Sequence, residues 1–305
     1  MKSTLSAPFF HDAAAAREHL ENLRWPDGPV CPHCGNYGKV WKVKSAKARA
    51  GVYKCSECRK QFTVTVGTLF ERSHVPLNMW FQAAYLLAGS KKGMSAHQLH
   101  RILGVTYKTA WFMAHRIREG MREFNPGPLG GKNKVVEADE TYIGGKARNA
   151  KRGAPIPKKE AVISLLERDG KVRSTHVPAV NHKNLRPVLV SQVDRKSYLM
   201  TDESRVYPKI GDEFAGHGTV NHSIEEYVRG QFWHTNTVEG YFSILKRGIN
   251  GVYQHVSQRH LKRYLGEFDF RYNTRKISDL ERTQEALKGI EGKRLTYRDS
   301  SPVAM

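Results

Sequence analysis

Apolar residues recur every three or four positions along residues 75–121, and this spacing predicts amphipathic helices. Ser95 can cap one helix and Thr106 the next, with Gly104 at the turn between them. The apolar positions that we expect to be buried are Leu99, Ile102, Leu103, Ala110, Trp111, Ala114 and Ile117. This order is typical of a helix-turn-helix unit, although an ordinary helical hairpin would show the same pattern.

Beyond residue 134 the pattern changes to short apolar runs that predict strands. VVEADETYIGG (135–145) is the first strand, and AVISLLER and KVRSTHVPAV form a hairpin around Asp169 and Gly170. A helix, a short strand that ends at Asp202, and the helix HTNTVEGYFSILKRGING follow. This succession predicts a mixed α/β sheet.

Carboxylates stand where these elements end or begin. Asp139 and Asp202 lie near the ends of two strands, and Glu239 lies in the first turn of a helix. In an α/β sheet such ends meet in one crevice, where converging carboxylates would repel one another without a cation. Mg²⁺ prefers oxygen ligands, and a pair of such ions about 3.5–4 Å apart can activate a water or a 3′-hydroxyl. The alternative is that these acids are simply solvated.

Strand alternation places Glu137 and Asp139 on one face and Glu140 on the other, and Asp139 lies nearest the end of the strand, where ligands bind. We therefore expect Glu137 and Glu140 to lie outside the metal's own ligands or in solvent. In the helix, Glu239 and Lys246 share a face, where a carboxylate could hold metal and a lysine a DNA phosphate. A solvated face would look the same. The apolar stripe opposite consists of Val238, Tyr241, Phe242, Leu245 and Ile249.

Two cysteine pairs precede the helices, each with two residues between its members. Strand-like pieces at 39–43 and 51–53 and the alternating QFTVTV (61–66) surround them. Two knuckles on hairpins that hold one tetrahedral zinc form a zinc ribbon, and its ligands would be Cys31, Cys34, Cys55 and Cys58. With four thiolates closing the site, His33 and His74 are expected to be surface or packing residues.

Charge points to a polyanionic partner. The 305 residues include 50 Lys plus Arg and 29 Asp plus Glu, a formal net charge of +21, which favours DNA or RNA and, less so, an anionic membrane. The chain has no run of about 18 apolar residues and no signal-peptide pattern at its start, so we expect a cytoplasmic protein, associated with the nucleoid when bound to DNA. The second helix of the pair would present Tyr107, Lys108 and Thr109 to a major groove, and Arg116 and Arg118 to phosphates.

The motifs CPHC…CSEC, VEADETYIGGK, MTDES, HTNTVEGYFSILKRGI and FDFRYNTR together resemble those of bacterial insertion-sequence transposases, most closely the insertion-sequence family numbered 1595. The resemblance runs from Leu23 to Arg275. It implies an RNase H-like catalytic domain of the DDE type, structural zinc and catalytic Mg²⁺ or Mn²⁺. It also implies binding of the element's terminal inverted repeats and target DNA, strand cleavage and strand transfer, and a homodimer or higher oligomer on DNA.

The resemblance also implies roles for single residues. Asp139 and Asp202 match the first and second catalytic acids, Glu239 matches the third, and Lys246 matches the basic residue seven positions later. Some members of the family have Asn at the third position, and Asn236 lies one turn before Glu239, so either side chain could face the metal.

The expected organisation is an N-terminal helical segment (1–27), a zinc ribbon (28–68), a helix-turn-helix domain (69–124), a linker (125–134), the RNase H-like domain (135–275) and a charged C-terminal tail (276–305). Two other functions fit the same motifs less well. One is a DNA-binding regulator with an inactive RNase H-like domain, which would not need the three acids. The other is a nuclease that hydrolyses DNA without strand transfer.

Overall fold

The computed structural model describes residues 3–45, 47–144, 158–220 and 234–296. The chain divides into two compact units. Unit 1 comprises Met1–Ser90, Met94–Arg122 and Ile277–Met305, and unit 2 comprises Lys91–Gly93 and Glu123–Lys276. None of the described helices is both long and apolar enough to cross a membrane.

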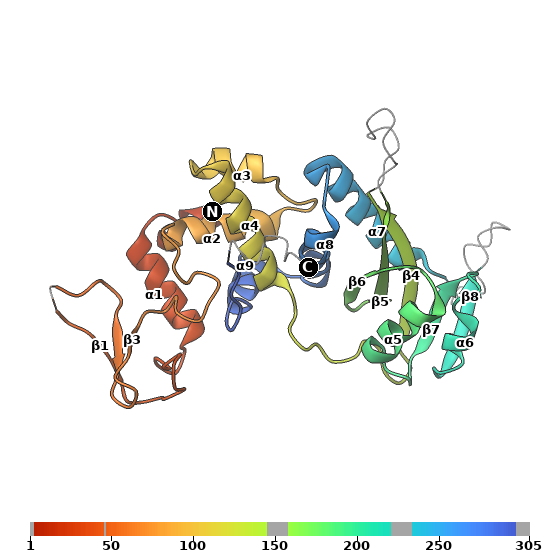
Figure 1. Cartoon of the computed structure of the whole chain (residues 1–305), viewed down its shortest axis with the longest axis horizontal. Helices are drawn as coiled ribbons and strands as arrows, with labels where there is room; N and C mark the ends of the chain where they lie inside the picture. The colour runs from red at the N-terminus through yellow and green to blue at the C-terminus, as the bar shows by residue number, and fades with distance from the viewer. Residues whose placement is uncertain (1–2, 46, 145–157, 221–233, 297–305) are drawn as a thin grey trace. The chain divides into compact units, whose positions relative to one another are not determined.

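Unit 1 combines a small sheet with helices (Figure 1). The strands β1 (Val40–Lys42), β2 (Tyr53–Cys55) and β3 (Gln61–Phe62) are antiparallel in the order β1-β2-β3. The helices are α1 (Ala13–Arg24), α2 (Leu77–Gly89), α3 (Ala96–Leu103), α4 (Tyr107–Met121) and α9 (Asp279–Lys288), preceded by 3₁₀ turns at Thr4–Ser6 and Pro8–Phe10.

The two predicted caps around the α3–α4 turn are confirmed. Ser95 Oγ accepts a hydrogen bond from the backbone N–H of Gln98 (3.1 Å), and Thr106 Oγ1 accepts one from the N–H of Thr109 (3.2 Å). Gly104 ends α3 with a φ of 65°, a left-handed conformation that costs glycine little. The local sequence thus ends one helix and starts the next within three residues. That this pair of helices binds DNA stays a prediction.

The buried side of the α3–α4 pair differs from expectation at Ile102. Leu99 and Leu103, four residues apart, define the buried stripe of the short helix α3, whereas Ile102 lies off that stripe and is 52% exposed. In α4, Ala110, Ala114 and Ile117 are buried as predicted, and Trp111 is half-buried.

The C-terminal segment expected as a charged tail instead contributes a helix to unit 1. α9 begins with a capping box between Ser278 and Glu281 and packs against α2 and α4. Its buried positions, with Ile290 beyond its end, recur at helical spacing among the charged residues: Thr283, Ala286, Leu287 and Ile290. The high charge of 276–305 masked this amphipathic stripe. Residues 297–305 lie outside the described part.

Unit 2 is the predicted mixed α/β sheet (Figure 1). Its strands are β4 (Val135–Ile143), β5 (Glu160–Glu167), β6 (Val172–Val177), β7 (Tyr198–Asp202) and β8 (Gly216–Val220), in the order β6-β5-β4-β7-β8. The β6, β5 and β4 pairings are antiparallel, and β4, β7 and β8 are parallel. The helices are α5 (His182–Gln192), α6 (Pro208–Gly211), α7 (Asn236–Gly248), which continues into a π-helical turn (Ile249–Tyr253), and α8 (Gln258–Asn273).

Helices cover both faces of this sheet. On one face, Val136 and Ala138 of β4 share a core with residues of α5 and α6. On the other face, Val162 and Leu166 of β5 share a core with α7 and α8. The predicted apolar stripe of α7 is confirmed, since its five members are at most 4% exposed. Each face of β4 therefore meets a different helical layer, and neighbouring side chains along β4 point into different environments.

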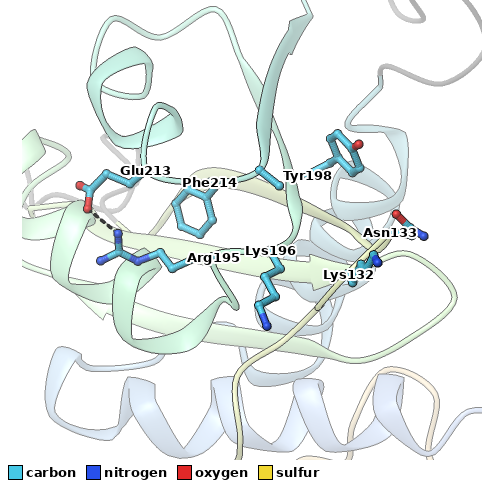
Figure 2. Close-up of a pocket in the computed structure, with 8 residues that line it drawn as sticks. Lys132, Asn133, Arg195, Lys196, Tyr198, Glu213 and Phe214 are labelled. Carbon is cyan, nitrogen blue, oxygen red and sulfur yellow. Dashed lines mark hydrogen bonds and ion pairs between the residues drawn. The ribbon is translucent and has the colours of Figure 1, made fainter.

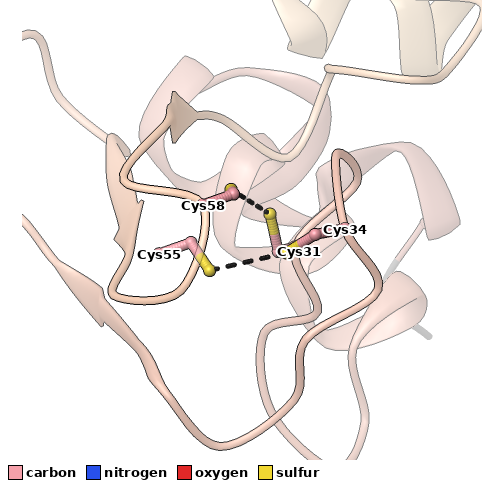
Figure 3. A group of neighbouring side chains, drawn as sticks. All are labelled: Cys31, Cys34, Cys55 and Cys58. Carbon is pink, nitrogen blue, oxygen red and sulfur yellow. Dashed lines mark hydrogen bonds between the residues drawn. The ribbon is translucent and has the colours of Figure 1, made fainter.

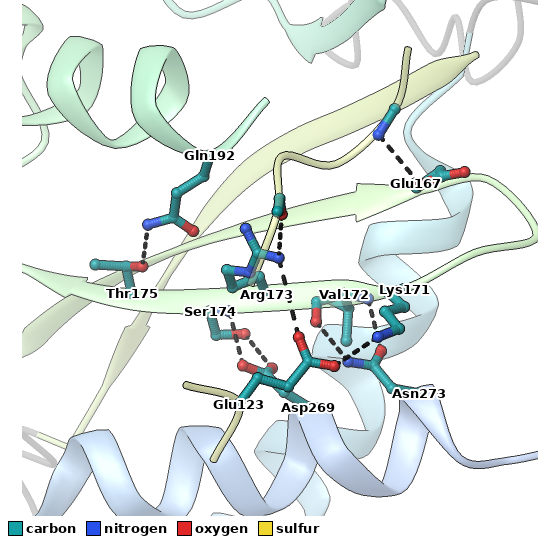
Figure 4. Close-up of polar contacts among 12 residues, drawn as sticks. Glu123, Glu167, Lys171, Val172, Arg173, Ser174, Thr175, Gln192, Asp269 and Asn273 are labelled. Carbon is teal, nitrogen blue, oxygen red and sulfur yellow. Dashed lines mark hydrogen bonds and ion pairs between the residues drawn. The ribbon is translucent and has the colours of Figure 1, made fainter. Parts of the chain in front are cut away.

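Side chains of α8 accept hydrogen bonds from backbone N–H groups at the outer edge of the sheet (Figure 4). The backbone N–H of Ser174 donates to Asp269 Oδ2 (2.8 Å), and the N–H of Val172 donates to Asn273 Oδ1 (2.7 Å). β6 is the edge strand, and α8 thereby supplies acceptors that a further strand would otherwise supply.

Candidate zinc site and acidic cluster

The four cysteines of unit 1 converge (Figure 3). Their four sulfur atoms all lie within 4.8 Å of one another. Two of the sulfur–sulfur distances are 3.6 Å, from Cys31 to Cys58, and 3.7 Å, from Cys34 to Cys55. Tight turns bring each pair together, with the N–H of Gly35 donating to the Cys31 carbonyl (2.9 Å) and the N–H of Cys55 donating to that of Lys60 (3.1 Å).

This sulfur cluster fits a zinc ion. A tetrahedral site with Zn–S bonds of about 2.3 Å places its sulfurs about 3.8 Å apart, close to the two distances above. Four cysteine ligands complete the coordination of zinc and leave no position for a substrate, which is the character of a structural site. His33 and His74 are exposed, as expected.

The strand predicted after the second cysteine pair is shorter than expected. β3 ends at Phe62, and residues 64–67 form turns in which the N–H of Val66 donates to the Thr63 carbonyl (3.0 Å). The alternation in QFTVTV was a weak guide, because Val64 is buried by the fold of unit 1 outside any strand.

The three predicted acids of unit 2 lie on β4, β7 and α7. Asp202 is the last residue of β7 and Glu239 lies in the first turn of α7, whereas Asp139 is the middle residue of β4 and does not lie near its end as expected. Glu137 of β4 stands opposite Met200 of β7 in the last pair of the parallel ladder. The same register, continued by two residues, brings Asp139 near Asp202, whose charge acts on it. The face of β4 that carries Asp139 meets α7, whose first turn carries Glu239.

The neighbouring acids affect the pKa of Asp139. Burial, and then the negative charges of Asp202, Glu140 and Glu239, raise the pKa of Asp139 to about 7, against the lowering effect of a hydrogen bond from the backbone of Glu140. Like charges disfavour one another's ionised forms, which is the condition that a bound cation relieves. Within the described ranges the cysteines are the group of potential ligands gathered within 4.8 Å, so the acids stand further apart than the thiols do.

Each acid is held by a local hydrogen bond. Asp139 Oδ1 accepts from the N–H of Glu140 (2.7 Å), and Asp202 Oδ1 accepts from the N–H of Ser204 (3.1 Å). Glu239 Oε1 accepts from the hydroxyl of Thr235 (3.0 Å). These contacts orient the three carboxylates.

Glu140 points to the opposite face of β4, as predicted. It accepts a hydrogen bond from the phenol of Tyr207, a fully buried residue that follows β7. Burial raises the pKa of Glu140, the bond from Tyr207 lowers it, and the charge of Asp202 raises it again. No motif or spacing in the sequence singled out Tyr207.

Glu137 is not solvated, which corrects one of the two environments expected for it. Its carboxylate is 0% exposed and binds Arg168 and the first turn of α7. Among the helix residues, Asn236 and Lys246 are exposed and Glu239 is half-buried.

The surface at the start of α4 matches expectation only in part. Tyr107 is 44% exposed and its ring stacks on His97 with centroids 4.3 Å apart; Lys108 is exposed and Thr109 half-buried. Arg116 and Arg118, expected to meet phosphates, are 8% and 2% exposed.

Arg116 and Arg118 are buried because α4 is packed against other helices of unit 1, namely α2, α3 and α9. Arg116 donates to the carbonyls of Leu295 (3.1 Å) and Glu71 (3.3 Å) and lies over the ring of Phe112. The Arg116 guanidinium therefore links parts of unit 1 and lies buried, away from the surface expected for it. Leu295, whose carbonyl accepts from Arg116, lies in the segment that was expected to be a tail. The sequence alone therefore did not indicate this partner of Arg116.

A separate pocket of about 480 Å³ opens at the other end of β7 (Figure 2). Tyr198 begins β7 and Asp202 ends it, so pocket and acids are about 13 Å apart along the strand. The ion pair between Arg195 and Glu213 (2.8 Å) borders it. Its lining consists of Lys132, Asn133, Arg195, Lys196, Tyr198, Glu213, Phe214 and Ala215.

Comparison with known proteins finds two matching families and a relative. Residues 128–273 match the ISXO2-like transposase domain, and residues 11–61 match the transposase zinc-ribbon domain. The chain is also 27% identical over 268 residues to an uncharacterized protein in transposable element ISH50 of Halobacterium salinarum, covering 83% of this chain and 88% of that protein. The zinc ribbon and the mixed α/β unit are thus the two parts of a transposase, and the chain belongs to the transposases of the insertion-sequence family numbered 1595.

Proposed function

We propose that this chain is a DDE transposase that binds the terminal inverted repeats of its element and catalyses metal-dependent strand cleavage and strand transfer. The observation that carries the proposal is the convergence of Asp139, Asp202 and Glu239, whose mutual repulsion contributes to the raised pKa of Asp139. The five-stranded mixed sheet covered by helices on both faces supports an RNase H-like domain.

The three acids fit Mg²⁺ or Mn²⁺. All are carboxylates on one side of the sheet, and hard divalent cations prefer such oxygen ligands. When bound, a metal pair supplies an activated water or 3′-hydroxyl and stabilises the leaving oxygen of the phosphodiester. Asp139 must release its proton to take part, with Asp202 and Glu239 on the same side of β4.

Glu239 is our choice for the third acid. Its charge raises the pKa of Asp139, so it lies within electrostatic reach of that acid, whereas Asn236 is the exposed first residue of α7. A neutral amide is also a weaker ligand for Mg²⁺ than a carboxylate. Lys246, exposed two turns along the same helix face, would orient DNA through a phosphate.

DNA recognition would begin at the first turn of α4. Tyr107, Lys108 and Thr109 stand at the N-terminal end of that helix, where recognition helices contact base edges. The net charge of +21 would supply non-specific affinity for phosphates, and binding of two element ends would require more than one copy of the chain.

The decisive assay uses the purified protein, DNA carrying the ends of the element that encodes it, and Mg²⁺, followed for nicking and joining. We expect both, and we expect Asp139→Asn, Asp202→Asn and Glu239→Gln to abolish them while end binding persists. Asn236→Ala should cost much less.

Two results would favour the other functions. Specific end binding by the wild-type protein without cleavage in Mg²⁺ or Mn²⁺ would favour a DNA-binding regulator. Cleavage without joining would favour a nuclease.

A further inference from the structure

We infer that Glu137 is a positioning residue that sets the place of Glu239 relative to Asp139. Glu137 and Asp139 are two residues apart on the same face of β4, and the Glu137 side chain reaches the first turn of α7. This inference rests on the proposed function, since it concerns the same three acids.

The Glu137 carboxylate caps α7 from outside the helix. Its Oε2 accepts from the N–H groups of Thr237 (3.0 Å) and Val238 (2.9 Å). These are the second and third residues of the helix, whose amides are normally satisfied by the side chain of the preceding cap residue. That residue, Thr235, directs its hydroxyl to Glu239 instead. Glu137 of β4 therefore acts as the N-terminal cap of α7 in place of Thr235.

The other oxygen of Glu137 is also occupied. Oε1 accepts from Thr237 Oγ1 (2.9 Å) and from Arg168 Nε (2.7 Å), and Arg168 donates in turn to the His234 carbonyl (2.8 Å). The carboxylate is 0% exposed, and both of its oxygens accept hydrogen bonds. A buried carboxylate with this many donors has little freedom, so the start of α7 is fixed to β4 in position and in rotation.

The consequence is geometric. Glu239 follows Val238, so an amide bound by Glu137 is next to the residue that must face Asp139. A shift of the first turn would carry Glu239 away from the other acids, and supports of this kind typically change metal affinity on the order of 10–100-fold. Glu137 touches neither metal nor substrate and acts through the helix.

The test is Glu137→Gln in the full zinc-loaded chain. Glutamine keeps the shape but replaces one acceptor oxygen with an N–H₂ group that would face donors. Mn²⁺ binding would be measured by electron paramagnetic resonance at pH 8, above the pKa of Asp139, beside cleavage of end DNA. We expect the Mn²⁺ dissociation constant to rise on the order of 10–100-fold, with faster hydrogen exchange at Thr237 and Val238.

Glu267→Gln is the matched control. Glu267 is also 0% exposed and pairs with an arginine, Arg271, but it lies in α8 and binds Tyr253 rather than the start of α7. It should lower thermal stability comparably and leave Mn²⁺ affinity unchanged. Thr237→Val, which removes one hydroxyl contact, should weaken Mn²⁺ binding severalfold and decides the matter if Glu137→Gln does not fold.

Wild-type Mn²⁺ affinity in Glu137→Gln, or equal losses in Glu267→Gln, would overturn the inference. A separate result marks failure of the proposed function itself: the wild-type chain would neither bind Mn²⁺ in a manner sensitive to Asp139→Asn nor cleave end DNA.

Discussion

The phenol of Tyr241 in α7 donates a hydrogen bond of 2.6 Å to Asp269 in α8, and Ser174 of β6 donates to the same carboxylate oxygen (2.7 Å). Three elements thus meet at one acid, and Figure 4 shows two of the residues, Ser174 and Asp269. Burial raises the pKa of Asp269 to about 6, although the hydrogen bonds from Tyr241 and Ser174 lower it.

This raised pKa predicts a pH-dependent loss of stability. Between the ordinary pKa of Asp, about 3.9, and about 6, the folded protein binds a proton at Asp269 more readily than the unfolded chain. The contribution of Asp269 to stability therefore declines as pH rises through that window. Denaturant unfolding of the wild-type protein and Asp269→Asn from pH 4 to 7 should show this slope in their difference. A pH-independent difference would contradict it.

Tyr207 should matter for stability through its hydroxyl alone. Tyr207→Phe leaves the buried ring and removes the donor to Glu140, which should cost about 2 kcal/mol and raise the pKa of Glu140 further. Tyr142→Phe is the control, because Tyr142 lies on β4 with Glu140 but is 52% exposed, and it should cost little. Equal stability of the two variants in denaturant unfolding would show that the Tyr207–Glu140 bond contributes nothing.

The zinc site should behave as one unit. Cys55→Ser should reduce zinc from about one ion per chain to none, because a closed tetrahedral site needs all four thiolates. Unit 1 should then unfold at a lower temperature and bind DNA more weakly. Ser56→Ala, at the exposed neighbouring position, should keep its zinc. Metal analysis and thermal unfolding check this; a well-folded wild-type protein without zinc would refute it.

Substitutions of Arg116 and Lys108, both in α4, should have different effects, the first on stability and the second on DNA binding. Arg116→Ala removes a buried group with two carbonyl partners and should cost about 2–3 kcal/mol. Lys108→Ala should leave stability unchanged but reduce the slope of log K against log salt for DNA by about 0.9, the loss of one phosphate contact. Denaturant unfolding and salt titrations of DNA binding distinguish the two. A reduced salt slope in a folded Arg116→Ala protein would place Arg116 on the DNA after all.

Local chemistry was enough to predict several parts of this protein. The caps at Ser95 and Thr106, the glycine turn between them, the apolar stripe of α7 and the cysteine pairs each depend on residues within a few positions of one another. The local sequence also predicted that Asp202 ends a strand and that Glu239 lies in the first turn of a helix, as in β7 and α7. Such features are readable because turns, caps and helical periods are set by nearest neighbours along the chain.

Long-range contacts decided the rest. Whether Arg116 faces solvent depends on Leu295, far along the chain, and α9 was hidden because its few apolar positions gain a partner only when α2 and α4 are in place. Strand alternation put Glu137 and Asp139 on the same face and gave them the same surroundings. Only the packing of α7 made one a buried cap for a helix and the other a half-buried acid facing Asp202, because a carboxylate's role is set by the donors and charges that the fold brings to it.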